Sequence, residues 1–138
     1  MHNPWQHLAD HHPDVDVVWT RLPGDMRGCT DGATVWMDTR LTQAQRRSVL
    51  CHETIHIERG TYPVCEAEER IVDRLCARRL VELDDLVHAL QDDPHQALTS
   101  LAARLWVTVE DVRCRLGSLE PWELADIENR LDLEWGAA

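Results

Sequence analysis

The sequence contains no lysine and no phenylalanine, so arginine supplies every basic side chain and tryptophan supplies most of the aromatic ones. Fourteen basic residues face 25 acidic ones, and the formal net charge is −11. Proteins that bind nucleic acid without sequence preference need a cationic surface to displace counterions from the phosphates. The charge therefore argues against direct nucleic-acid binding as the main function.

Long apolar runs are also missing from the chain. No stretch approaches the roughly 20 apolar residues that span a bilayer, and the N-terminal residues do not have the pattern of a secretory signal. The five cysteines are an odd number and include no C-x-x-C pair. This disfavours a disulfide framework and a four-cysteine zinc site. We expect a cytoplasmic protein with reduced thiols and no membrane partner.

The length of 138 residues and the hydrophobic fraction of 43% predict one folded unit. We expect an irregular N-terminal tail over residues 1–14, a core over residues 15–92 and a C-terminal helical subdomain over residues 93–138, packed on that core. Two β-branched segments, 15–22 and 33–39, predict strands that pair as a small hairpin, with Val35 and Met37 on one face.

Helical periodicity replaces strand periodicity after the second strand. The first helix is expected to start at about Thr42 or Gln43, and capping residues and prolines mark later starts at Asp93 with Pro94, Thr108 and Pro121. We expect about six helices over residues 42–57, 66–81, 83–90, 94–105, 107–119 and 121–135. A small hairpin followed by helices predicts an α+β fold.

The motif with the clearest chemistry is H-E-x-x-H at residues 52–56. His52 and His56 are four residues apart, so they lie on one face of a helix and can hold one metal ion together. Neutral imidazoles suit Zn²⁺, with Mn²⁺ as the alternative, and a fourth position would remain open for water. Glu53 can act as the general base on that water. The structural alternatives are a polar helix edge formed by the histidines and a surface ion pair from Glu53 to Arg46 or Arg47.

A third metal ligand is expected from the second helix. Glu69 is followed four residues later by Asp73, which can support a ligating histidine from the second coordination sphere. Glu66 and Glu68 compete on the same turn, but neither has an aspartate four residues on. An acidic first turn favoured by the helix dipole would explain the three glutamates but not Asp73.

The segments RRSVLCHETIHIERG and EERIVDRLCARRLVELDDL resemble the ImmA/IrrE family of metallopeptidases, especially its short actinobacterial and phage-type members. The family pattern is H-E-x-x-H followed by E-x-x-A-(D/N)-x-(F/L)-A and a leucine pair. The chain matches the second part of it at Glu69, Asp73, Leu75, Ala77 and Leu80. It departs from the pattern at two packing positions, Val72 and Cys76.

This resemblance covers about residues 15–118. It implies a zincin-like fold and an intracellular, zinc-dependent endopeptidase. It also implies a protein substrate, a helix-turn-helix transcriptional repressor often encoded nearby on a mobile element or prophage, whose cleavage relieves repression.

Residues 97–116 have the pattern of a helix-turn-helix, with Arg113 and Arg115 on the second helix. The alternatives are an antiparallel helix pair packed on the core or a docking surface for the repressor. Acidic residues at 110 and 111 and the net charge disfavour DNA contact. The main alternative to a peptidase is a non-catalytic regulator that binds a repressor or DNA through these helices.

Tyr62 and His88 are candidates for stabilising an oxyanion, with ordinary packing as the alternative. Four N-terminal histidines, at positions 2, 7, 11 and 12, suggest either a second metal site or a solvated tail. The arginines at 70, 74, 78 and 79 form a strip that either contacts an acidic substrate or pairs with nearby carboxylates.

Overall fold

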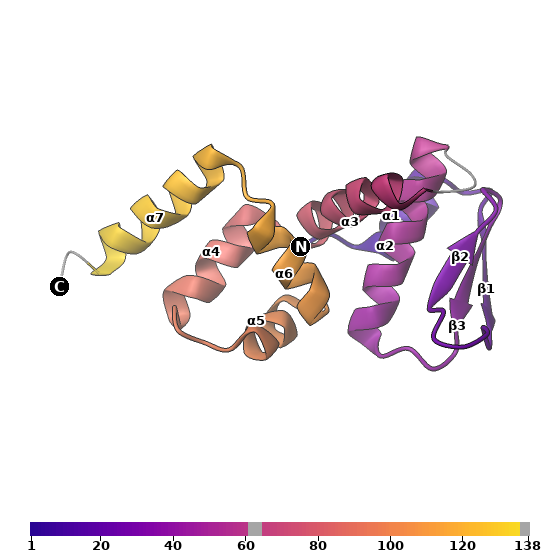
Figure 1. Cartoon of the computed structure of the whole chain (residues 1–138), viewed down its shortest axis with the longest axis horizontal. Coiled ribbons are helices and arrows are strands. Elements are labelled where there is room, and N and C mark those ends of the chain that lie inside the picture. The colour runs from indigo at the N-terminus through magenta and orange to yellow at the C-terminus, as the bar shows by residue number, and fades with distance from the viewer. Residues whose placement is uncertain (61–64, 136–138) are drawn as a thin grey trace.

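The structure is a computed structural model that describes residues 1–60 and 65–135, with side chains up to residue 131. It is an α+β protein, as predicted. The elements are, in order, α1 (Pro4–His11), β1 (Asp16–Thr20), β2 (Gly28–Thr30), β3 (Thr34–Asp38), α2 (Gln43–Arg59), α3 (Glu66–Leu80), α4 (Leu83–Asp92), α5 (Leu98–Leu105), α6 (Val109–Gly117) and α7 (Pro121–Trp135). Figure 1 shows the sheet, α1 and α2 at one end of the molecule and α4 to α7 at the other.

The sheet has the strand order β1-β3-β2, and this contradicts the expected hairpin between 15–22 and 33–39. β1 and β3 do pair, but in parallel, while β2 and β3 form the antiparallel pair. The tight turn lies between β2 and β3, where Asp31 accepts hydrogen bonds from the amides of Ala33 and Thr34 and Gly32 has φ = 97°. Because β2 occupies one edge of β3, only the other edge remains for β1.

The inner face of the sheet packs on α2. Val35 and Met37 are fully buried and contact Val49 and Leu50 of the helix, which confirms the predicted alternation of β3. α2 begins after the N-cap Thr42, whose side chain and that of Gln45 form a capping box. It ends two residues later than expected, at Arg59, followed by Gly60 in the left-handed conformation.

Residues 4–11 form a helix, so the prediction of an irregular tail over 1–14 is wrong for most of that segment. Asn3 caps α1 by accepting hydrogen bonds from the amides of Trp5 and Gln6, and Pro4 occupies the first helical position. α1 packs against α2 and buries Leu8. The Asn-Pro pair at residues 3 and 4 is a helix start signal. The helix was not predicted because the segment has many histidines and only a short apolar stripe.

Six helices follow the sheet, as predicted, with one difference at the start of the C-terminal group. α5 begins at Leu98 and not at Pro94, because Asp93 ends α4 and its side chain accepts a hydrogen bond from the amide of His95 in a turn. α4 packs against α5 and α7, and its apolar side chains share a hydrophobic core with α2 and α3. The starts at Thr108 and Pro121 are confirmed.

A buried ion pair fixes the C-terminal helices on α3. Arg115 of α6 pairs with Glu123 of α7, and both side chains are almost fully buried. Arg78 of α3 donates a hydrogen bond to the same carboxylate at 2.7 Å. Apolar side chains of α2 and α3 share one hydrophobic core with those of α4 to α7. Among the described residues, none of the helices has the length and apolar character needed to cross a lipid bilayer.

Candidate metal centre

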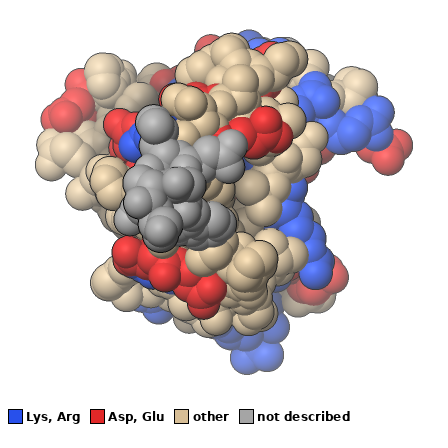
Figure 2. All heavy atoms as spheres, turned by 90° about the vertical axis from the view of Figure 1, so that its left-hand side faces the viewer, with Lys and Arg blue, Asp and Glu red and all other residues tan. Residues whose placement is uncertain are grey.

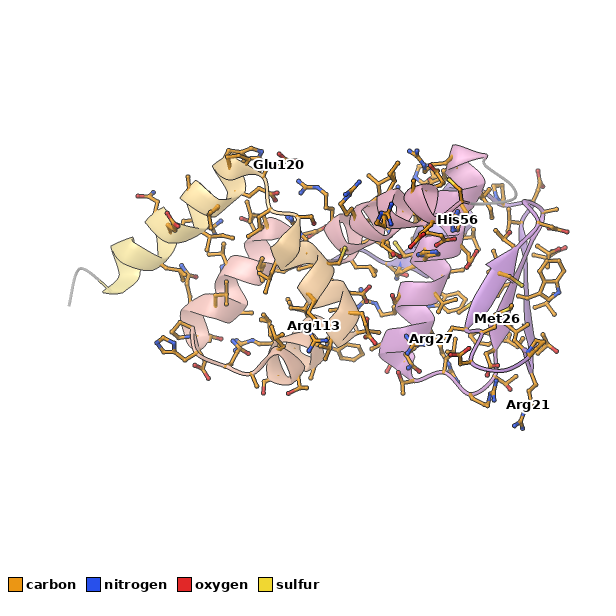
Figure 3. All side chains as sticks on the ribbon, in the orientation of Figure 1. Arg21, Met26, Arg27, His56, Arg113 and Glu120 are labelled. Atoms are coloured by element: carbon orange, nitrogen blue, oxygen red, sulfur yellow. The ribbon has the colours of Figure 1, made fainter. Side chains whose placement is uncertain are left out.

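The crossing of α2 and α3 brings the three predicted ligands together. Nε2 of His52 lies 3.1 Å from Nε2 of His56, and the carboxylate of Glu69 lies 3.0 Å from each of these atoms. Two ligand atoms bound to a tetrahedral zinc ion at 2.0–2.1 Å are about 3.3 Å apart. Glu69 reaches His52 through Oε2 and His56 through Oε1, so each neighbouring pair of donor atoms is close to the spacing that one zinc ion requires. Figure 3 shows His56 where the two helices approach each other.

Asp73 sets the orientation of the His52 ring. Its Oδ1 lies 3.1 Å from Nδ1 of His52, on the opposite side of the ring from the Glu69 contact. Burial alone lowers the pKa of His52, but the carboxylates of Asp73, Glu53 and Glu69 outweigh it and raise the pKa to about 8. The carboxylate of Asp73 thus holds the imidazole at Nδ1 and would make its Nε2 a better metal ligand.

His56 is buried, with 3% of its surface exposed, so the alternative of a solvated polar helix edge does not apply to it. Burial and the neighbouring His52 lower its pKa, which favours the neutral, metal-binding form. Among the described residues its Nδ1 has no hydrogen-bond partner. Two imidazole nitrogens and a carboxylate that converge at 3.0–3.1 Å fit a divalent metal ion well.

Glu53 lies beside the ligands and is also buried, with 8% of its surface exposed. Burial raises its pKa to about 7; His52 opposes this shift and Glu69 adds to it. The alternative of a surface ion pair to an arginine is wrong. Arg47 is itself buried and donates to the backbone carbonyls of residues 2, 105 and 106, while Arg46 lies over the ring of Trp19 at 5.2 Å.

A cleft of about 280 Å³ opens beside His52 and Glu53. β2 and the residue before it supply one wall, and the start of α6 supplies the other. Ser48 of α2 donates a hydrogen bond to Asp111 at 2.9 Å and so holds α6 at this distance. A larger cavity, of about 530 Å³, lies elsewhere between α1, Trp19 and Trp106, and the ligand cluster is not part of it.

Gly28 permits β2 to approach α2 at this cleft. A Cβ atom at this position would lie 2.4 Å from Cγ1 of Val49 and 3.7 Å from Cγ of Glu53. No signal in the sequence distinguished Gly28 from the other loop glycines. Its role depends on a contact between residues far apart in the chain.

The competing glutamates point elsewhere. Glu66 is highly exposed and lies 3.5 Å from Arg70, which confirms the i,i+4 pair expected in the arginine strip. Glu68 pairs with Arg59 at the end of α2. Glu69 is thus the glutamate of the first turn that reaches both histidines.

Of the two candidates for an oxyanion stabiliser, the structure describes only His88. His88 lies exposed on α4, and its Nδ1 is 2.8 Å from the backbone oxygen of Asp84 in the preceding turn. His88 is not among the residues that line the cleft beside His52 and Glu53, so the structure does not bring it to the site. Tyr62 lies outside the described residues.

The helix-turn-helix-like segment is a helix pair packed on the rest of the molecule. α5 contacts α6, and α6 packs on α3. Arg115 is buried against Glu123, so it does not face solvent, whereas Arg113 is exposed. On the side of α7, arginine side chains are interleaved with acidic and uncharged ones (Figure 2).

The N-terminal histidines are not a solvated tail. His7 and His12 both contact the carboxylate of Glu58 at the end of α2. Arg79, a member of the arginine strip, pairs with the same carboxylate; the sequence did not predict this group because Glu58 lies more than 20 residues from each of its partners.

No protein-family model, no curated protein sequence and no solved structure matches this chain.

Proposed function

We propose that this chain is a zinc-dependent endopeptidase of the ImmA/IrrE type, with a zincin-like arrangement of its active helices. The observation that carries the proposal is the convergence of His52, His56 and Glu69 from two helices at 3.0–3.1 Å, with Glu53 buried beside them. The resemblance of the same segments to that family also supports the proposal.

The residues of the cluster divide into ligands and a general base. His52, His56 and Glu69 would hold the zinc ion, which acidifies a water molecule and polarises the scissile carbonyl when it is bound. Glu53 takes a proton from the attacking water and later delivers it to the leaving amine. Its buried position beside the two histidines suits a residue that exchanges protons with a bound water.

The cleft fits an extended peptide. β2 is the last strand of the sheet on the side of the cleft, and Gly28 contributes no side chain there. An extended chain can add to such an edge through backbone hydrogen bonds, while pockets beside it select side chains. A peptide bond laid along β2 would pass close to Glu53, whose Cγ is near Gly28.

The substrate that we propose is a transcriptional repressor of the helix-turn-helix class, cleaved in the cytoplasm. The family resemblance supports this choice. The burial of Arg115 and the net charge of −11 count against the alternative in which the chain regulates transcription by binding DNA itself.

The test compares wild type with Glu53→Gln at equal zinc occupancy on a repressor encoded beside the gene. Glutamine keeps the size of the side chain but removes the base, so cleavage should fall by at least ~10²-fold while zinc remains bound. Glu66→Gln, an exposed change on the neighbouring helix, is the matched control and should cleave like wild type. Equal rates for wild type and Glu53→Gln would refute the catalytic role. No cleavage by either protein would favour the non-catalytic regulator.

A further inference from the structure

A second group of two imidazoles and one carboxylate lies where α1 meets the end of α2. Nε2 of His7 is 2.9 Å and Nε2 of His12 is 3.2 Å from the same oxygen, Oε2, of Glu58. The histidines precede Glu58 by 51 and 46 residues, so folding and not local sequence assembles the group. The donor set is the same as in the proposed peptidase centre.

Arg79 of α3 orients the carboxylate of Glu58. Its Nη1 donates to the other oxygen, Oε1, at 2.8 Å, and this leaves Oε2 facing the two imidazoles. A ligating carboxylate commonly has such a hydrogen bond on its second oxygen. The same guanidinium lies 3.5 Å from Nε2 of His7, and its charge opposes a cation there. We therefore expect weaker binding than at the first centre.

The group is partly shielded but reachable from solvent. The side chains of His7, His12 and Glu58 are 20%, 21% and 26% exposed. Glu58 follows His56 by two residues, which corresponds to about 200° around the helix axis. The group therefore lies on a different face of α2 from the proposed peptidase centre.

We infer that His7, His12 and Glu58 form a second divalent-metal site, suited to Zn²⁺. All three donor atoms lie within 4.8 Å of one another, and imidazole nitrogen with carboxylate oxygen is a donor set that zinc accepts. A bound ion joins α1 to α2 and, through Glu58 and Arg79, to α3. The competing arrangement has no metal, and each imidazole donates an Nε2–H hydrogen bond to Glu58.

Zinc stoichiometry tests the site, measured by competition with a chromophoric chelator in the presence of a phosphine reductant. The wild-type protein should bind two equivalents, and His7→Ala/His12→Ala should bind one with an unchanged affinity at the remaining site. His52→Ala/His56→Ala should also retain one. His88→Ala/His95→Ala, which removes two exposed histidines elsewhere, is the matched control and should bind two.

The single variants His7→Ala and Glu58→Ala should each lower the affinity for the second zinc ion by at least about tenfold. Loss of a residue that only supports a ligand already lowers metal affinity by about 10–100-fold. Cobalt bound by His52→Ala/His56→Ala should show no thiolate charge-transfer band, which distinguishes the site from cysteine ligands. Such a band would overturn the proposal, as would a stoichiometry that His7→Ala/His12→Ala leaves unchanged.

If the alanine variant does not fold, His7→Gln/His12→Gln decides the question. Glutamine can still donate hydrogen bonds to Glu58 but is a poor zinc ligand, so a folded variant that lacks the second equivalent supports the site. Retention of that equivalent overturns it. A missing equivalent at His52 and His56, with the second one present, would contradict only the proposed function.

Discussion

Asp73 accepts a hydrogen bond from Nδ1 of His52 at 3.1 Å. The other nitrogen of the same ring, Nε2, lies 3.0 Å from Glu69, one helical turn before Asp73 on α3. One helix thus supplies both the carboxylate that shares the proposed metal position and the carboxylate that directs the ring toward it. The placement of α3 over α2 therefore controls the geometry of the whole cluster.

Replacing Asp73 tests whether α3 directs the His52 ring toward the proposed metal position. Asp73→Asn keeps the shape of the side chain but removes its charge, so the His52 ring loses its anionic partner. We expect zinc affinity to fall by about 10–100-fold with the fold intact, measured by chelator competition and circular dichroism. Asp126→Asn on α7 serves as the control. An unchanged affinity would show that His52 needs no support from α3.

The three glutamates at the start of α3 should differ sharply. Glu69→Ala removes a ligand and should weaken zinc binding far more than Glu66→Ala or Glu68→Ala, because the latter two pair with arginines outside the cluster. Parallel zinc titrations of the three variants measure the difference. If Glu66→Ala or Glu68→Ala causes the larger loss, the assignment of the third ligand is wrong.

Gly28→Ala should destabilise the protein by about 1–3 kcal/mol, because the new Cβ overlaps Cγ1 of Val49. Urea denaturation measures the change. The double variant with Val49→Ala should recover part of that cost, since the overlapping methyl group is then absent. Gly117→Ala is the control, because a Cβ at that position meets nothing within 4 Å. Equal effects at the two glycines would mean that β2 moves away from α2 without cost.

Glu123 should make the protein acid-sensitive. Hydrogen bonds from Arg115, Arg78 and the amide of Glu120 outweigh burial and hold its pKa at about 2, below the ordinary value of 4.5. A depressed pKa in the folded state contributes stability that is fully present above about pH 4.5 and is lost as the pH falls toward 2. The contribution is on the order of 3 kcal/mol.

Glu123→Gln removes this contribution and leaves the buried Arg115 without its charged partner. We expect it to be about 3–5 kcal/mol less stable than wild type at pH 7. Between pH 4.5 and 2, the free energy of unfolding of Glu123→Gln should fall less than that of wild type. Urea denaturation at each pH measures both. Parallel pH profiles for the two proteins would contradict the assignment of the acid sensitivity to Glu123.

The sequence by itself determined most of the helices after the sheet and the composition of the His52, His56 and Glu69 cluster. His52 and His56 share a face because they are four residues apart on one helix, and Glu69 and Asp73 have the same spacing on the next. The starts at Thr42, Thr108 and Pro121 follow from capping chemistry within a few residues. Spacing of this kind is local, so one helical turn is enough to predict which side chains point together.

Only the tertiary structure decided the relationships between distant segments. The parallel pairing of β1 with β3 depends on which edge β2 leaves open, and the docking of α1 depends on Leu8 and on Glu58, far along the chain. The burial of Arg115 similarly required Glu123 on another helix. Distant segments pair so that together they bury apolar surface and give each buried charge a partner. No single segment specifies such a pairing.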